Sequence, residues 1–427
     1  GNTAEIDLTN ITAISGSFTE LKAIIDGKGN VGSNSKFSGV GAQALTVDTG
    51  SISVTNANTL SAATTGRVTA TVDSGTLTTL NGLNAAGTPA NGDAFALTLT
   101  STSVDAGDLD TLDSKIDQGN GGSININTVV KLTGTITEVE NFITNKNNFT
   151  NNTNIVDVDL SGTIGDAAAV DTLSTNLRSL ESPGNTAEIN LTGVTAISGT
   201  FAQLETIIDG KGNVGSNSKF SGLGAQTLTE DSGGTISVSE ANKLTGATSG
   251  AVSATVASGT LSDLNALSDA SEPTNGNNLV LTLTSTSVDA GDLATLDSKV
   301  DQTGSGSINI NTVVKLTGTI TEVEQFITDK NNFTNNTNIV DVDLSGTIGD
   351  AAAVDTLSTN LRALENPGNT AEINLTGVTA ISGSYAEIKA IIDGKGNVGS
   401  NSKFSGVAAQ ALTVDTGSIS VANANIL

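Results

Sequence analysis

The chain contains no cysteine, histidine, methionine or tryptophan, and it has one tyrosine among 427 residues. These absences exclude zinc, haem and iron–sulfur centres and the nucleophile systems that depend on Cys or His, because each needs side chains that the chain lacks. Carboxylates, hydroxyls, amides and a few basic groups remain. Without a disulfide, a chain of this length must be stabilised by apolar burial and hydrogen bonding.

Basic side chains are also scarce, with 18 Lys and Arg against 44 Asp and Glu, a net charge of −26 and a pI of about 4.1. So few cations cannot neutralise phosphates, which excludes nucleic acid as a partner. No stretch approaches the roughly 18 consecutive apolar residues of a membrane span, so the sequence predicts none. Hydrophobic residues make up 36% and glycine adds 48 residues, a composition typical of a folded chain.

Tandem repetition dominates what is present. The hexapeptide GNTAEI begins at Gly1, Gly184 and Gly368, which gives spacings of 183 and 184 residues. We therefore predict three domains: a first copy at residues 1–183, a second at 184–367 and a partial third at 368–427. Neither end carries the atypical polar residues of a capping repeat, so we expect the chain to be a window on a longer polymer.

A shorter period lies inside each copy, with six segments of about 31 residues. Residues 67–84 serve as the example, because Val68, Ala70 and Val72 alternate as in a strand while Leu77 and its neighbours follow a helical period of three. Stacking such segments predicts a mainly β fold, a parallel β-solenoid with a short helix per coil, right-handed by the crossover rule.

Capping chemistry supports the short helices. The pattern S/T-x-x-E/Q, in which two side chains satisfy backbone N–H groups at a helix start, occurs at Ser17 with Glu20, Thr137 with Glu140, Thr200 with Gln203 and Ser384 with Glu387. Asp105 and Ser239 suit the same role. Helices this short are marginal alone, so they must be stabilised by stacking.

One loop is identical in all three copies, and it reads DGKGNVGSNSKFSG at residues 26–39, 209–222 and 393–406. Its oxygen-bearing side chains could hold a hard cation such as Ca²⁺, through Asp26, Asn30, Asp209, Asn213, Asp393 and Asn397. A second interpretation is that its Lys and Phe side chains contact a neighbouring protomer. A third is that recent duplication alone explains why the three loop sequences are identical, with the Phe side chain packed on its own chain. No cofactor is required by any of these interpretations, and Ca²⁺ is the candidate.

A second conserved insertion reads KNNFTNNTN at residues 146–154 and 330–338. It matches the N-glycosylation pattern, but a polar loop anchored by one aromatic is the favoured interpretation. The two insertions together supply the candidate contacts between subunits, in loops expected to be exposed: Lys36, Phe37, Phe149, Lys219, Phe220, Phe333, Lys403 and Phe404.

Paired carboxylates are the remaining enzyme signal, since acid–base hydrolysis needs two in one cleft. Asp105 with Asp108 and Asp157 with Asp159 qualify by spacing, yet both pairs recur in the second copy. Because enzymes rarely repeat an active site with the scaffold, we attribute these carboxylates to capping and solvation. The chain is predicted not to be an enzyme.

Two segments carry a resemblance to known proteins: ANKLTGATSGAVSATVASGTLSDLNALSDA at residues 241–270 and STSVDAGDLATLDSK at residues 285–299. They resemble the Thr/Ala/Asp-rich tandem repeats of very large secreted or cell-surface proteins of bacteria, of the adhesin, surface-layer and extracellular-filament type. The resemblance implies an extracellular or cell-surface location and a structural role. We therefore expect a repeat segment of a self-assembling filament, tube or surface appendage, with other copies of itself as partner; the alternative is the stalk of a large adhesin or calcium-dependent surface-binding protein.

Overall fold

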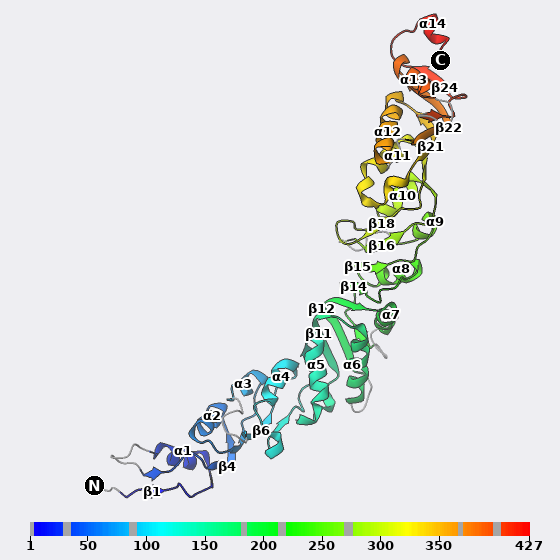
Figure 1. The fold of residues 1–427 in the computed structure, drawn as a ribbon. Helices are drawn as coiled ribbons and strands as arrows, with labels where there is room; N and C mark the ends of the chain where they lie inside the picture. The colour runs from blue at the N-terminus through cyan, green and yellow to red at the C-terminus, as the bar shows by residue number, and fades with distance from the viewer. Residues whose placement is uncertain are drawn as a thin grey trace. The chain divides into compact units, whose positions relative to one another are not determined.

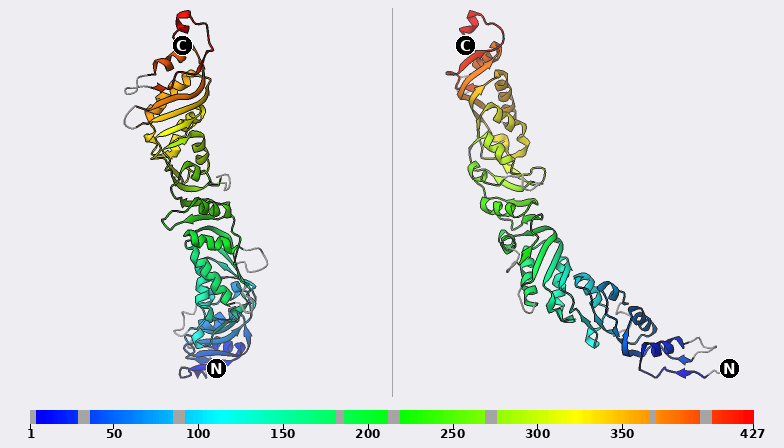
Figure 2. Two further views of the ribbon diagram at one scale, coloured as in Figure 1. Left: turned by 90° about the vertical axis from the view of Figure 1, so that its right-hand side faces the viewer. Right: turned by 180° about the vertical axis from the view of Figure 1, so that it is seen from behind.

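The computed structural model describes residues 4–28, 36–84, 92–180, 186–211, 219–268, 276–365, 370–395 and 403–427. These residues form two compact units, shown as ribbons in Figures 1 and 2. Unit 1 comprises Gly1–Ile197 with Thr206–Leu223, and unit 2 comprises Ser198–Glu205 with Gly224–Leu427.

Strands and short helices alternate along unit 1. Its helices are α1 (Phe18–Asp26), α2 (Val54–Ala63), α3 (Leu77–Leu80), α4 (Ala106–Asp113), α5 (Ile136–Thr144) and α6 (Ala167–Leu180). Its strands are β1 (Ile6–Asp7), β2 (Ala13–Gly16), β3 (Phe37–Ser38), β4 (Ala44–Ile52), β5 (Val68–Val72), β6 (Ala94–Thr98), β7 (Ser103–Asp105), β8 (Ser123–Asn125), β9 (Lys131–Gly134), β10 (Phe149–Thr150), β11 (Asp157–Ile164), β12 (Glu188–Gly199) and β13 (Phe220–Ser221). The unit boundary falls inside the end of β12 and inside α7 (Phe201–Gly210).

Unit 2 repeats the alternation. Its helices are α8 (Val238–Ala247), α9 (Leu261–Leu264), α10 (Ala290–Asp297), α11 (Ile320–Thr328), α12 (Ala351–Leu364), α13 (Tyr385–Asp393) and α14 (Val421–Ala424). Its strands are β14 (Thr227–Glu230), β15 (Val252–Thr255), β16 (Asn278–Thr282), β17 (Ser287–Asp289), β18 (Ser307–Asn309), β19 (Lys315–Gly318), β20 (Phe333–Thr334), β21 (Asp341–Ile348), β22 (Glu372–Gly383), β23 (Phe404–Ser405) and β24 (Ala411–Val414). Five short 3₁₀ turns occur among the described residues of the chain.

Every strand pair recorded among the described residues is parallel. In unit 1 one sheet runs in the order β10-β8-β6-β5-β4-β2 and another in the order β12-β11-β9-β7, with β13 beside β12 and a small β1-β3 pair. In unit 2 the orders are β20-β18-β16-β15-β14 and β17-β19-β21-β22-β23, with β24 also beside β22. The predicted parallel pairing of successive segments is therefore confirmed.

Helices cover one face of each sheet, and the other face meets solvent. In β11, Val158, Leu160 and Ile164 are buried while Asp157 and Thr163 are exposed. In unit 2, α10, α11 and α12 lie in a row against β19, β21 and β22 (Figure 1). The core of each unit is thus a layer of Leu, Ile and Val between one sheet face and the apolar stripes of the helices.

The expectation of a mainly β, parallel β-solenoid is wrong. Among the described residues the fold is mixed α/β, with 14 helices, 36% helix and 32% strand, and its parallel sheets are open with no closed solenoid. The physical reason is that the segments after the strands keep a helical spacing of apolar residues. This spacing extends over as many as 14 residues, in α6 and α12. A helix that long covers a sheet face instead of turning a corner of a coil.

Helix starts follow the capping chemistry closely. Four helix starts match the prediction. Three are capped by a Ser or Thr together with a partner three residues on: Ser17 at α1, Thr200 at α7 and Ser384 at α13. The fourth helix, α4, is capped by Asp105, whose side chain accepts from two backbone N–H groups. Two assignments were wrong by two residues. The helix α5 begins from a Thr135–Glu138 box instead of Thr137, and α8 begins from Ser237 instead of Ser239.

The helices are short and amphipathic. The longest helices of the described segments have 14 residues. Within those segments we find no helix with the length and apolar character needed to cross a membrane.

Close backbone approach at two glycines joins neighbouring segments. A Cβ on Gly66 or Gly250 would lie 2.4 Å from the carbonyl oxygen of Gln43 or Gln226, which belongs to the preceding segment. Real Cβ atoms do not come this close to backbone, so a side chain at either position would push the two segments apart.

We predict that Gly250→Ala destabilises the protein by about 1–3 kcal/mol, because the added methyl group meets rigid backbone. Gly246→Ala is the matched control: no atom lies within 4 Å of its Cβ position in the last turn of α8. The control should be neutral or stabilising by up to about 1 kcal/mol. Guanidinium unfolding followed by circular dichroism measures both, and equal midpoints for Gly250→Ala and the parent would contradict the prediction.

Candidate functional site

The strand β24 in unit 2 has one partnered side and one open side. It pairs with β22 in parallel register, with Ile381 opposite Leu412 and Gly383 opposite Val414. Among the described residues no strand pairs with its other side. An unpaired strand edge presents a row of backbone N–H and C=O groups that can bind another strand.

Apolar side chains next to this edge are uncovered. Four of them are half-buried or exposed: Leu412, Ile419, Ala424 and Leu427. The residues at the same positions in the two earlier copies are all buried: Leu45, Ile52, Ala57 and Leu60 in the first, and Leu228, Ile236, Ala241 and Leu244 in the second. We call the open side of β24, with Gln410 and these four apolar residues, the β24 groove.

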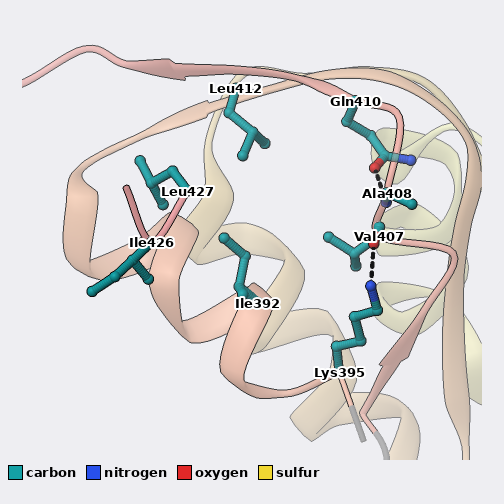
Figure 3. Close-up of a pocket in the computed structure, with 8 residues that line it drawn as sticks. All are labelled: Ile392, Lys395, Val407, Ala408, Gln410, Leu412, Ile426 and Leu427. Atoms are coloured by element: carbon teal, nitrogen blue, oxygen red, sulfur yellow. Dashed lines mark hydrogen bonds between the residues drawn. The ribbon is translucent and has the colours of Figure 1, made fainter. Parts of the chain in front are cut away.

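The groove is hollowed (Figure 3). A cavity of about 190 Å³ lies between α13, the turn before β24 and the segment after α14, and Leu412, Leu427 and Ile392 point into it. A wider hollow of about 550 Å³ runs along Leu412 and Leu427 toward Ile419 and Ala424. Its apolar lining favours an apolar occupant, because burying such surface contributes about 25 cal/mol per Å².

Polar groups hold the turn before β24 in place. Lys395 Nζ donates to the carbonyl of Val407 at 2.6 Å, and Gln410 Oε1 accepts from the backbone N–H of Ala408 at 2.9 Å (Figure 3). Gln410 Nε2 donates to the carbonyl of Leu375 at 2.8 Å, which ties the turn to β22. The side chain of Gln410 is thus used within the chain, while its backbone faces the groove.

The arrangement can bind a chain segment, and it has no acid–base pair. Its ligand groups are backbone carbonyls and N–H groups beside an aliphatic floor. Sequence reasoning did not single out this groove, because Leu412 and Leu427 look like the core positions Leu45 and Leu60. They are exposed because the residues that cover Leu45 and Leu60 follow Leu60 in the first copy, whereas the sequence stops at the equivalent position, Leu427.

The predicted cation ligands are only partly described. The carboxylate of Asp26 pairs with Lys22 at 2.5 Å, and that of Asp393 pairs with Lys389, both on exposed helix surface. Asp209 is exposed near the end of α7. The other predicted ligands, Asn30, Asn213 and Asn397, lie outside the described residues. Within those residues no group of three or more acidic side chains could hold a metal, and the Ca²⁺ site stays a prediction.

The candidate contact phenylalanines were expected to be exposed, and this is corrected. Four of the five are buried within their own chain: Phe149, Phe220, Phe333 and Phe404. Phe37 is half-buried. Phe149 packs on Phe142 with ring centroids 5.3 Å apart. The physical reason is that each insertion returns to pair with the sheet as a short strand, which carries its aromatic side chain into the core.

The candidate contact lysines remain at the surface. Lys219 pairs with Asp171 at 3.0 Å and Lys403 with Asp355 at 2.9 Å, each with part of its side chain in solvent. Lys36 is exposed. These ion pairs fasten the end of the repeated loop to the preceding long helix in the second and third copies, and at such exposed positions they contribute little stability.

Two of the four paired carboxylates make contacts within the fold. Asp105 caps α4, and Asp159 pairs with Lys131 at 3.0 Å while accepting from Asn190 at 3.1 Å. Asp341, the second-copy counterpart of Asp157, has a raised pKa, because its partial desolvation outweighs the attraction of Lys315. None of these carboxylates belongs to the β24 groove.

One carboxylate pair was not anticipated. Asp297 accepts from Gln302 at 2.8 Å and Asn332 at 2.7 Å, and it lines a small cavity together with Asp329. Burial raises the pKa of Asp297, and the neighbouring charge of Asp329 acts in the same direction. The first copy has Asn145 where the second has Asp329.

No family model matches the chain, and no curated protein matches it. The resemblance to large bacterial repeat proteins therefore stays a prediction.

We predict that Asp329→Asn raises the free energy of unfolding at pH 7 by about 0.5 kcal/mol, because it removes a like charge next to Asp297. A raised pKa means that folding favours protonated Asp297, so the cost of its charge appears as pH rises through that pKa. The gain should therefore vanish below about pH 3, where aspartates are protonated. Guanidinium unfolding at both pH values measures it.

The reciprocal variant Asn145→Asp is the control, since it introduces the same charge in the first copy. It should lower stability at pH 7 by a similar amount. A gain for Asp329→Asn that is equal at both pH values would contradict the electrostatic explanation.

Proposed function

We propose that this chain is a structural protein, a repeat segment that associates with other copies of itself in an extracellular filament, tube or surface appendage. One observation carries the proposal: the helices and strands from β7 to β12 recur 184 residues later as β17 to β22, so the chain presents the same parallel architecture at a fixed interval. Repetition of this kind suits contacts between equivalent surfaces of many copies.

The pairing pattern supports extension in one direction. Because all recorded strand pairs are parallel, any strand added to a sheet in the same sense would leave a new edge of the same kind. A contact of this type joins two different surfaces, and repeated heterologous contacts give open filaments when the geometry does not close a ring. The extracellular location rests on the resemblance of residues 241–270 and 285–299.

Repetition of the architecture also favours a structural role. The elements from β7 to β12 recur 184 residues later as β17 to β22, with the same lengths and register shifts between β11 and β12 as between β21 and β22. Identical elements presented at a fixed interval suit a protein that builds a periodic assembly. Ca²⁺ remains a candidate partner of the conserved loops, so assembly is best compared with and without a chelator.

We predict that association strengthens with salt, because a net charge of −26 makes copies repel one another. Raising ionic strength from about 0.01 M to about 1 M shortens the Debye length from about 30 Å to about 3 Å, which leaves apolar contact as the main interaction between copies. Sedimentation velocity should show a rising average mass, and negative-stain electron microscopy should show filaments or tubes.

Single particles at every salt concentration, with and without Ca²⁺ or chelator, would contradict the proposal. That result would favour the stalk of an adhesin, whose recognition function lies elsewhere. Loss of assembly in chelator alone would make the acidic loops metal sites that control it.

A further inference from the structure

We infer that Asn120 is a site of spontaneous covalent modification, at which the side-chain amide is lost through a cyclic imide formed with Gly121 and is replaced by a carboxylate. The reactants are this side chain, the next peptide nitrogen and water, so the reaction needs no enzyme. The inference is independent of the proposed function, because it concerns the chemistry of one turn in unit 1.

Asn-Gly pairs are the places where this reaction is least hindered, because glycine has no Cβ to block the approach of its nitrogen to the asparagine side chain. The sequence holds four such pairs, at residues 81–82, 91–92, 120–121 and 275–276. Both members are among the described residues in two of them, Asn81 with Gly82 and Asn120 with Gly121. These two pairs have very different surroundings.

The pair at Asn120 lies in an open turn. Asn120 ends the 3₁₀ turn Gln118–Asn120, and both it and Gly121 are exposed. Gly121 has a φ of 102°, and no atom lies within 4 Å of the position that a Cβ would take. Its N–H makes a long hydrogen bond of 3.3 Å to the carbonyl of Gln118. The attacking nitrogen is therefore weakly held and has room to turn toward the side chain.

The carboxylate of Asp117 holds the amide that would react. Asn120 Nδ2 donates to Asp117 Oδ2 at 2.7 Å, and the backbone N–H of Asn120 donates to Oδ1 at 3.1 Å. Both bonds lie within the exposed turn, where water replaces a lost partner at little cost. The side chain can thus leave Asp117 without disturbing the core.

The pair at Asn81 is constrained. Asn81 Nδ2 donates to the carbonyl of Asp108 at 2.9 Å, in the next segment, and its Oδ1 is buried. The carbonyl of Gly82 accepts from Asn58 at 2.8 Å, in the preceding segment. Ring closure here would break contacts among three segments, so we expect Asn81 to react far more slowly than Asn120.

Water is the co-reactant that balances the reaction. The nitrogen of Gly121 gives its proton to a base in solvent and bonds to Cγ of Asn120, while the Cγ–Nδ2 bond breaks and Nδ2 leaves as ammonia with a proton from water. A second water then opens the five-membered imide. Cleavage at Cγ gives aspartate, and cleavage at the backbone carbonyl carbon gives isoaspartate, whose main chain runs through Cβ and Cγ. No atom is oxidised or reduced.

Either product places a second carboxylate beside Asp117. The bond from Nδ2 is lost and two like charges face each other, which disfavours the turn. The turn leads into β8, and the N–H of Gly122 donates to the carbonyl of Asp117 at 3.0 Å. Isoaspartate also lengthens the main chain. The modification should therefore loosen residues 117–122 and make the chain more acidic.

The second copy supplies a matched control within the same chain. Gly304 stands where the first copy has Asn120, so this position carries no amide. Trypsin cuts after Lys and Arg and releases residues 116–131 from the first copy and residues 300–315 from the second. Both peptides end in SININTVVK, so their other asparagines are the same.

The test incubates the intact chain at neutral and at mildly alkaline pH and follows both peptides by mass spectrometry. A growing fraction of peptide 116–131 should show the mass of an acid in place of an amide, and peptide 300–315 should stay unchanged. Conversion should be faster at alkaline pH, because the nitrogen of Gly121 must lose its proton. Electron-transfer fragmentation identifies isoaspartate at residue 120, and hydrogen exchange should show lost protection at residues 117–122.

Two variants assign the reaction to this pair. Asn120→Gln should abolish conversion, because its longer side chain cannot close the five-membered ring. Gly121→Ala should slow conversion, because it restores a Cβ next to the attacking nitrogen. Circular dichroism confirms that both variants fold.

Three outcomes would overturn the inference. An unchanged mass of peptide 116–131 at both pH values would remove the modification. Equal conversion in Asn120→Gln would place the reaction at another asparagine of the peptide. Conversion of Asn81 as fast as that of Asn120 would show that the open turn does not select the site.

Discussion

Parallel pairing of each strand with the next is the interaction on which the rest of this structure depends. The ladder fixes the register of neighbouring segments, and register decides which side chains face the helices. Val68 can fill the core only while it lies opposite Leu45. Short helices such as α3 and α9, with four residues each, are stable because this pairing places their leucines against a formed sheet.

Side-chain hydrogen bonds at the ends of the strands complement the parallel backbone pairing. Hydroxyl groups and amides satisfy the backbone where strands end, as in the bond from Thr64 to the carbonyl of Gln43, and glycines permit the approach that these bonds need. This explains why the composition is rich in Gly, Thr and Asn and poor in aromatic residues. It also explains how a chain without disulfides remains ordered through many small segments, since each contact is local to two neighbours.

The same reliance on neighbouring segments makes strand edges reactive. A strand that depends on the next one for burial exposes aliphatic side chains and backbone groups wherever no next strand is present, and β24 is such a strand because the sequence stops within the third copy. Surface charge opposes uncontrolled use of this edge, because the acidic residues keep separate molecules apart at low salt. Affinity at the edge and repulsion over the surface together would make association selective.

Sequence alone determined the repeat, the parallel pairing and most helix starts, because periodicity, capping boxes and alternation are local properties read within a few residues. It did not determine the fold class. Whether the apolar residues after β21 turn a corner or extend as the 14-residue helix α12 is decided by the sheet face available to cover. Burial of Phe220 and Phe404 and the raised pKa of Asp297 are likewise tertiary, because they arise from segments brought together by folding.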